Sequence, residues 1–221
     1  MNTPLLYLAA LQGVFGKREE CNLGSITDAL FVYLDGEPEK ESLDRVDACF
    51  RDRPLVCLTN SWEEQIRTQY PEAATYRRTM MKPACRFIIP KKMEIPEDCL
   101  LTGMDEAAFE RHPFSHGMNY SCFAAFRAEG SGAVIYHGEE IVAAASSFLS
   151  LNGEVEMDIS TKEAFRRKKL ATACAAWMLR DCMERGITVH WDAQNDVSRH
   201  LAEKFGFEIE KEYSVYWLPS S

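Results

Sequence analysis

The sequence of 221 residues has little of what marks a disulfide-bonded or zinc-binding protein. Its eight cysteines include no C-x-x-C pair, and their spacing is irregular. Regular cysteine pairs are the usual sign of a disulfide framework or a structural zinc site. We therefore expect reduced thiols, no metal and a cytoplasmic location.

The sequence also has no hydrophobic run long enough to span a membrane. The apolar segment PLLYLAALQGVF lies near the N-terminus, but Lys17 and Arg18 follow it instead of preceding it. A signal peptide has the opposite order, and a membrane helix needs about 20 apolar residues. Leu5, Leu8 and Leu11 instead share one face of a helix. We expect no membrane partner.

An excess of basic residues is missing too. The 34 Asp and Glu residues outnumber the 25 Lys and Arg residues, and the formal net charge is −9. Nucleic-acid binding needs a basic surface, because it is driven by the release of cations from the phosphates. RNA-binding surfaces have aromatic residues between their basic residues. The basic run 166–169 has none. Nucleic acid is therefore excluded as a partner.

The apolar pattern predicts an α/β fold with a mixed (α+β) sheet. The first part of the chain is expected to hold helices at about 5–17, 41–53 and 61–70 and strands at 29–35 and 54–59. Ser61, with Glu64 three residues later, predicts a capping box at the start of the third helix. Residues 82–104 carry three prolines around the strand-like 85–89, which indicates a connection between two domains. These domains are predicted as 1–100 and 101–221.

The second part of the chain is richer in strands. Helices are expected at 105–112 and 119–129, strands at 132–138, 141–151 and 154–161, a further helix at 196–205 and a last strand at 207–218. Asn152-Gly153 between two alternating segments predicts a hairpin. The segment 155–193 reads as strand–helix–strand, which predicts a right-handed parallel crossover.

Four cations follow the strand 154–161, directly before the crossover helix. They are Arg166, Arg167, Lys168 and Lys169. The first N–H groups of a helix lack partners, and the helix dipole ends positive there, so such a turn binds phosphate. Basic charge at this end is unfavourable by roughly 0.3–1 kcal/mol per residue without an anion. We expect this turn to hold a pyrophosphate.

With these motifs, the C-terminal half resembles the GNAT superfamily of acyl-CoA-dependent N-acetyltransferases, and most of all its bacterial branch with an extra N-terminal α/β region. The turn of that family reads Arg/Gln-x-x-Gly-x-Gly/Ala. Here it reads Arg166-Arg167-Lys168-Lys169-Leu170-Ala171. A strand ending in WDA, then Asn195, Ser198 and KFGF ending at Phe207, match the next motif in order and spacing. The resemblance covers about residues 105–218 and implies a GNAT-like acyl-CoA N-acyltransferase fold there.

The resemblance implies acetyl-CoA as co-substrate. Ile159 and Thr161 would contact the pantetheine amides through main-chain groups, and Asn195 and Ser198 would cap a helix beside the pantetheine arm. The residues expected at the cofactor are Ile159, Thr161, Arg166, Arg167, Lys168, Lys169, Leu170, Ala171, Thr172, Asn195 and Ser198. Lys169 stands where the family has glycine. Its side chain would crowd the ligand or, with helical dihedrals, contact the phosphate directly.

Acetyl transfer to an amine needs a group that takes the amine proton. Glu156 and Asp158 share one face of the strand 154–161. The resemblance implies a general base on this strand: Glu156 is the first choice and Asp158 the alternative, unless both only form a solvent-facing side. The family's tyrosine acid corresponds to Ala202, so Tyr213 and Tyr216 are candidate replacements. We count Tyr213 with the catalytic residues.

The function implied is transfer of an acetyl group from acetyl-CoA to the primary amine of a small, cationic acceptor by direct attack. The departure at Lys169 and the missing tyrosine leave a non-catalytic CoA-binding or sensing module as the alternative. Asp192 is either a substrate contact or a turn residue, and His190 is expected to be satisfied in the sheet. Residues 1–100 form either a degenerate copy that shapes the acceptor pocket or a dimer interface. The assembly is expected to be a monomer or homodimer.

Overall fold

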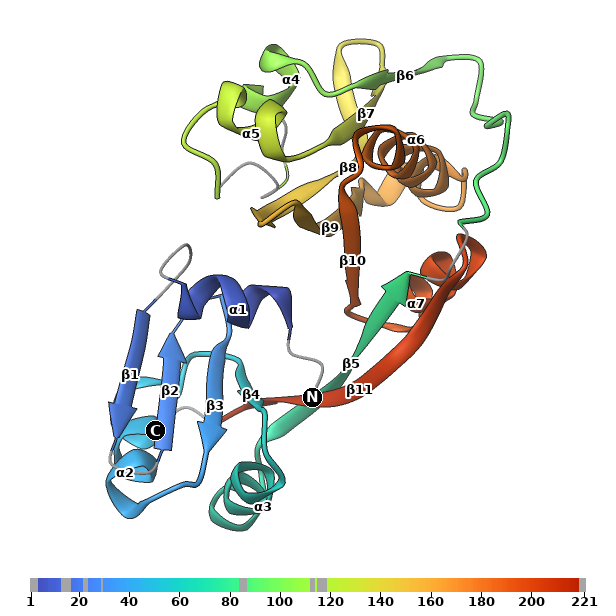
Figure 1. The fold of residues 1–221 in the computed structure, drawn as a ribbon. Helices are drawn as coiled ribbons and strands as arrows, with labels where there is room; N and C mark the ends of the chain where they lie inside the picture. The colour runs from blue at the N-terminus through green and yellow to red at the C-terminus, as the bar shows by residue number, and fades with distance from the viewer. Residues whose placement is uncertain are drawn as a thin grey trace. The chain divides into compact units, whose positions relative to one another are not determined.

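The computed structural model describes residues 4–12, 17–21, 24–28, 30–83, 87–111, 114 and 119–218, with only the backbone course for 17–21 and 24–25 (Figure 1). The chain forms two compact units. The first comprises Met1–Met80 with Glu210–Ser221, and the second comprises Met81–Ile209. The sequence analysis placed a single boundary at residue 100, whereas the first unit ends at Met80 and also includes the C-terminal part of the last strand.

The first unit is built around a mixed sheet. Its elements are α1 (Leu5–Leu11), β1 (Lys17–Cys21), β2 (Gly24–Asp28), β3 (Val32–Gly36), α2 (Lys40–Cys49), β4 (Leu55–Cys57), α3 (Asn60–Gln69), most of β5 (Ala74–Pro83) and the end of β11 (Phe207–Trp217). The strand order is β1-β2-β3-β4-β11-β5. The strands β1, β2 and β3 are antiparallel, β3 and β4 are parallel, and β4 and β11 are antiparallel.

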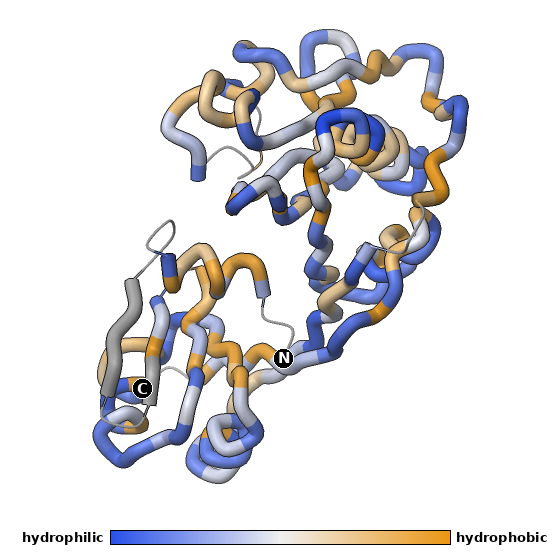
Figure 2. Tube along the Cα trace, viewed as in Figure 1, coloured by the Kyte–Doolittle hydropathy of each residue, from blue (hydrophilic) through white to orange (hydrophobic). Residues whose placement is uncertain are grey.

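Helices cover both faces of this sheet. α2 and α3 bury Val46, Trp62 and Ile66 in one core cluster with the apolar residues of β3 and β4. On α1, Tyr7 packs against Tyr33 with ring centroids 5.3 Å apart, and the helix is mostly orange in Figure 2 because it consists of Leu, Ala and one Tyr. The first sheet is thus buried by apolar side chains on two sides.

The second unit holds the strands predicted for the C-terminal half. Its elements are β6 (Cys99–Gly103), α4 (Glu106–Arg111), α5 (Phe123–Glu129), β7 (Gly132–His137), β8 (Glu140–Leu151), β9 (Glu154–Thr161), a 3₁₀ turn (Glu163–Phe165), α6 (Leu170–Arg185), β10 (Thr188–Ala193) and α7 (Asp196–Lys204). The strand order is β10-β9-β8-β7-β6. β9 and β10 are parallel, and the other pairs are antiparallel.

Two sequence predictions are confirmed at the centre of this unit. Asn152 and Gly153 have φ of 53° and 81°, and this pair of positive angles joins β8 and β9 in a tight hairpin. β9, α6 and β10 form the predicted strand–helix–strand crossover with parallel strands, and Val189 lies opposite Val155. α6 covers one face of β7–β9 (Figure 1). α4 and α5 cover the opposite face around Phe126.

Several predicted boundaries were wrong. The N-cap of α3 is Thr59, whose Oγ1 accepts from the Trp62 N–H at 3.4 Å, and Ser61 lies inside the helix. β5 and β6 were not predicted. α1 ends at Leu11 and not near 17, although residues 13–16 lie outside the described part. No helix among the described residues is long and apolar enough to cross a membrane.

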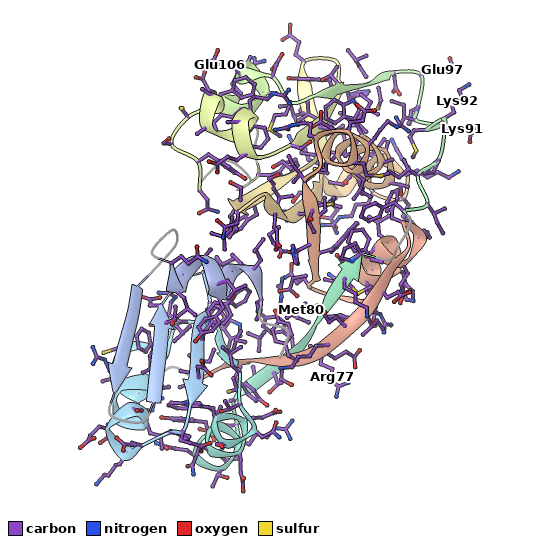
Figure 3. All side chains as sticks on the ribbon, viewed as in Figure 1. Arg77, Met80, Lys91, Lys92, Glu97 and Glu106 are labelled. Atoms are coloured by element: carbon purple, nitrogen blue, oxygen red, sulfur yellow. The ribbon has the colours of Figure 1, made fainter. Side chains whose placement is uncertain are left out.

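The strand-like pattern at 85–89, within the predicted connection, does not form a strand in its described residues. Residues 84–86 lie outside the described part, and 87–90 form no strand. Ile88 instead donates its N–H to the carbonyl of Phe205 at 3.0 Å. Lys91, Lys92 and Glu97 lie on the same connection between β5 and β6, and Met80 marks the passage from the first unit to the second (Figure 3).

The two units repeat one order of elements. Three antiparallel strands are followed by a helix, a strand parallel to the third, a second helix and a long strand. The two copies are β1-β2-β3-α2-β4-α3-β5 and β7-β8-β9-α6-β10-α7-β11. Their last strands are exchanged, since β11 pairs with β4, whereas β5, which ends in the second unit, is the neighbour of β10.

The burial of the cysteines predicts their order of reaction. Cys49 and Cys122 are exposed, whereas Cys57, Cys174 and Cys182 are buried. Burial raises the pKa of Cys57 to about 12 and that of Cys182 to about 11, and only the thiolate reacts quickly. Iodoacetamide at pH 8 should therefore modify Cys49 and Cys122 before the three buried thiols of the described residues, as measured by peptide mass mapping. A buried thiol that reacts as fast in folded as in guanidinium-unfolded protein would contradict the packing.

Candidate functional site

The turn between β9 and α6 combines a closed start with a left-handed end. The Arg166 N–H donates to the Glu163 carbonyl at 3.2 Å and closes the 3₁₀ turn. Arg167 and Lys169 then have φ of 63° and 62°, while Lys168 between them has a negative φ. Alternating backbone handedness directs successive N–H groups toward one point, which is how backbone anion-binding nests are formed. The turn therefore has the backbone of an anion site.

The N–H groups of this turn are unused. Within the described part of the chain, none of the N–H groups of 167–172 has a hydrogen-bond acceptor. The first N–H taken in α6 is that of Ala173, which donates to the Lys169 carbonyl at 3.0 Å. No side chain caps this 16-residue helix. The free N–H donors of α6 and the positive end of its dipole are thus available to an anion at the turn.

The four cations of the turn are all exposed. Lys168 lies over the Phe165 ring, with Nζ 4.9 Å from the centroid. Lys169 Nζ is 3.9 Å from the Glu94 carboxylate, a pair in which both side chains are more than two-thirds exposed. Such an exposed ion pair contributes little to the stability of the fold. Arg166 and Arg167 form no ion pair with any described residue, and binding of a pyrophosphate at this turn stays a prediction.

Lys169 does not have the helical dihedrals that would direct it as a helix residue toward a phosphate. Its φ of 62° and ψ of 13° lie in the left-handed region. The lysine therefore keeps the backbone conformation for which glycine is the usual residue. The departure from the family pattern changes the side chain and not the course of the turn.

The two ends of α6 allow a matched stability test. Both Lys169 and Gly186 have left-handed dihedrals, with φ of 62° and 68°. Lys169→Gly should raise the free energy of unfolding by up to about 1 kcal/mol, since relief of strain exceeds the entropy that glycine loses. Gly186→Ala should lower it by about 1–2 kcal/mol, because open space around Gly186 leaves only backbone strain. Urea unfolding measures both, and a destabilising Lys169→Gly would contradict the expectation.

β9 and β10 separate beside this turn. Their pairing ends at His190 opposite Glu156, although β9 continues to Thr161. At the start of the pair, the Thr188 N–H donates to the Gly153 carbonyl at 3.0 Å. After the end of β9, the Lys162 N–H donates to the Val142 carbonyl of β8 at 2.9 Å. Main-chain groups alternate along a strand, so those of the odd-numbered residues of β9 face β10. Beyond the last pair they face the opening between the strands.

Ile159 and Thr161 are the residues whose main-chain groups border this opening. Both lie on β9 past its last pair with β10. The buried Oγ1 of Thr161 has no hydrogen-bond partner among the described residues. Buried polar atoms are normally paired, so this hydroxyl has hydrogen-bonding capacity that the described residues do not use.

Glu156 and Asp158, the two predicted bases, are in different surroundings. Glu156 is buried, with 7% of its surface exposed, and its Oε1 accepts from the Asp192 N–H at 2.8 Å. Asp158 is half-buried on the part of β9 that borders the opening. Glu154, on the same face, bonds to His190 at 2.7 Å, so the expectation that His190 is satisfied in the sheet is confirmed.

The predicted cap of α7 is confirmed for one of its two residues. Asn195 is the N-cap, and its Oδ1 accepts from the Ser198 N–H at 3.0 Å. The Ser198 hydroxyl instead accepts from Trp191 Nε1 at 3.0 Å. Ser198 thereby ties β10 to α7, and any contact of these residues with a cofactor stays a prediction.

The tyrosine acid stays unassigned. Ala202 is fully buried in the core of the second unit, at the position where the family pattern places a tyrosine. Tyr213 and Tyr216 lie on the part of β11 that belongs to the first unit. The Tyr216 hydroxyl donates to Glu63 at 2.8 Å and accepts from Arg67 Nε at 3.0 Å, so it is engaged in the packing of β11 on α3. The catalytic role of Tyr213 stays a prediction.

Comparison with known proteins identifies this arrangement. Residues 6–216 match the family described as GNAT acetyltransferase. The chain belongs to this GNAT family. It is 30% identical over 133 residues, 58% of its length, to the "uncharacterized N-acetyltransferase YdfB" of Bacillus subtilis (strain 168), and the match spans 51% of that protein.

Solved GNAT structures have the same fold. A GCN5-related N-acetyltransferase-like protein from Streptococcus suis 89/1591 aligns with a TM-score of 0.79 at 25% identity, over 98% of this chain and 93% of its own. A GCN5-related N-acetyltransferase from Kribbella flavida aligns at 0.65 and 15% identity, over 100% and 98%. The predicted GNAT fold is confirmed, and the similarity extends over the N-terminal half.

The first unit of this GNAT protein has an acidic turn at the position that corresponds to the cationic one. Glu37 and Glu39 lie between β3 and α2. The end of β3 is also occupied: Trp62 Nε1 donates to the Asp35 carbonyl at 2.9 Å, and Thr59 Oγ1 donates to the Gly36 carbonyl at 2.9 Å. The protein's own side chains thus use the polar groups that β9 leaves unused.

Sequence reasoning missed the contact between Glu156 and the main chain of Asp192. It links a side chain of β9 to a main-chain group of β10, two segments 36 residues apart. No motif marks such a contact. The only available signal was that an acidic residue stands at a strand position flanked by buried Val155 and Met157.

Proposed function

We propose that this GNAT protein transfers an acetyl group from acetyl-CoA to the primary amine of a small acceptor. The observation that carries the proposal is the continuity of the opening between β9 and β10 with the cationic turn. β9 runs from Glu154 to Thr161 and leads directly into this turn. A ligand with phosphates at the turn and an arm along β9 would therefore have its reactive end near Asp158.

The residues present fit acetyl-CoA in two respects. The unused N–H groups of 167–172, with Arg166 beside them, suit the pyrophosphate. The main-chain groups of Ile159 and Thr161, with the unpartnered Thr161 hydroxyl, suit the amides of the pantetheine arm. Lys168 and Lys169 add positive potential at the surface of the turn.

The reaction needs one proton acceptor from the protein. The acceptor nitrogen attacks the thioester carbonyl, a C–N bond forms, and collapse of the tetrahedral intermediate breaks the C–S bond. We assign Asp158 as the base that takes the amine proton, because it borders the opening whereas Glu156 is bound to the Asp192 main chain. The leaving thiolate takes a proton from water.

The acceptor is proposed to be cationic before it loses its proton. Asp158 and Asp192 place carboxylates beside the opening between β9 and β10, and the whole chain has a net charge of −9. Opposite charge favours both the encounter and the recognition of such an amine. The cytoplasmic location and a monomeric or homodimeric state remain predictions from the sequence.

A thiol-release assay tests the proposal. The protein is mixed with acetyl-CoA and a panel of small primary amines, and free CoA is followed with a thiol reagent against a protein-free control. Amine-dependent thiol release supports acetyl transfer. Binding of acetyl-CoA without release for any amine favours the non-catalytic CoA-binding module. Neither binding nor release would reject both.

A further inference from the structure

We propose that Glu156 is a positioning residue that maintains the opening between β9 and β10, and that it is not the general base. Its carboxylate accepts the Asp192 N–H at 2.8 Å, directly after the last residue pair of the two strands. The effect on acetyl-CoA rests on the proposed function. The contact itself belongs to the protein alone and is testable without a ligand.

The Glu156 carboxylate replaces a bond of the parallel ladder. In a regular parallel pair, the N–H groups of alternate residues on one strand donate to carbonyls of alternate residues on the other. The Thr188 N–H follows this pattern with the Gly153 carbonyl. Two steps further, the pattern would pair the Asp192 N–H with the Met157 carbonyl. Glu156 Oε1 takes that N–H instead.

The replacement has a consequence for each strand. On β10, the N–H of Asp192 is satisfied although the ladder has ended. On β9, the residue pairing with β10 ends at Glu156, so the main chain beyond this residue borders the opening. Glu156 thereby provides an acceptor for the main chain of β10 where this strand leaves β9.

Two further contacts flank Glu156, and neither includes its carboxylate or the Asp192 N–H. On the closed side, Glu154 bonds to His190 at 2.7 Å. On the open side, Trp191 Nε1 donates to the Ser198 hydroxyl at 3.0 Å, which holds β10 against α7. Glu156 is 7% exposed between these two contacts. Removal of its carboxylate would leave the Asp192 N–H without this acceptor, and an unmade hydrogen bond of a buried group is costly.

The two roles of Glu156 respond differently to substitution. A general base needs a carboxylate, so Glu156→Gln would remove it. A hydrogen-bond acceptor needs only the side-chain oxygen, which Gln retains and Ala lacks. Glu156→Gln and Glu156→Ala therefore separate a positioning residue from a catalytic one.

The first measurement uses the ligand-free protein. Amide hydrogen exchange at Asp192 is followed by NMR in the wild type and both Glu156 variants, with Glu154→Ala as a control on the same face and circular dichroism as a check of folding. Glu156→Ala should accelerate exchange at Asp192 by about tenfold or more, whereas Gln and the control should not. Exchange at Asp192 unchanged in folded Glu156→Ala would overturn the proposal, whether or not the protein binds a CoA.

The second measurement compares acetyl-CoA affinity with turnover. Glu156→Gln should retain Kd and kcat within about threefold, whereas Glu156→Ala should raise Kd by about tenfold. A Glu156→Gln variant with unchanged Kd and a kcat lowered a hundredfold or more would identify Glu156 as the base and overturn the proposal. If the wild type binds no CoA, the proposed function fails and the exchange measurement alone decides the role of Glu156.

Discussion

Reversal of two charges in the cationic turn should abolish tight binding of acetyl-CoA. The double variant Arg166→Glu and Lys168→Glu should raise Kd by at least about 100-fold, because each lost contact between a cation and a phosphate contributes about 1.5–3 kcal/mol. Both side chains are exposed beside N–H groups without an acceptor in the described part of the chain. Isothermal titration calorimetry measures the effect.

The control must change the total charge by the same amount. Lys40→Glu and Lys211→Glu reverse two exposed cations of the first unit and shift the net charge equally. This variant should bind acetyl-CoA within about threefold of the wild type, as a general field effect at physiological salt is screened over about 8 Å. Equal losses in both double variants would show that the turn has no specific role.

Asp158→Asn should lower kcat by about 10²–10⁴-fold at neutral pH without a change in the Kd of acetyl-CoA, which is the range for loss of a general base. The variant retains size and hydrogen-bonding capacity but no longer takes a proton. The loss should become smaller as the pH approaches the pKa of the acceptor amine, because more of the amine is then already neutral. Initial rates of thiol release between pH 6 and 10 measure this recovery.

Glu154→Gln is the matched control for Asp158→Asn. Glu154 lies on the same face of β9 and bonds to His190 where the two strands are still paired. Its substitution should leave kcat within about threefold, since it touches neither the opening nor the turn. A full rate in Asp158→Asn would instead assign proton removal to another group or to water.

Much of the second unit could be predicted because its signals are local. Strict alternation with Asn152-Gly153 specifies the β8–β9 hairpin, whose two positive φ angles these residues tolerate well. The crossover follows from the order strand–helix–strand and the general handedness rule. The cationic turn follows from its position before α6 and from the resemblance to the GNAT family.

What could not be predicted depends on tertiary contacts. β6 was missed because prolines at 83, 90 and 96 resemble a linker, and most of β5 lies in a stretch before Pro83 for which no element was predicted. Strand pairing decides the structure of both. The left-handed backbone of Lys169 has no signal in the lysine itself and only the family's glycine indicates it. The bond from Glu156 to Asp192 joins two strands that no local pattern relates.

The polar contacts of the first unit bear on how many acyl-CoA molecules one chain binds. Its corresponding turn carries Glu37 and Glu39, and Trp62 and Thr59 occupy the carbonyls at the end of β3. We propose that this unit is a degenerate copy that has lost acyl-CoA binding. The chain should then have one acyl-CoA site, although its element order is repeated.

Calorimetric titration of the wild-type protein with acetyl-CoA tests the central claim most directly. One molecule of acetyl-CoA should bind per chain with micromolar affinity, and the Arg166→Glu and Lys168→Glu variant should show no measurable heat of binding at the same concentrations. Absence of binding of acetyl-CoA and of free CoA to the folded wild type, or full binding in the charge-reversed variant, would contradict an acyl-CoA site at the β9–α6 turn.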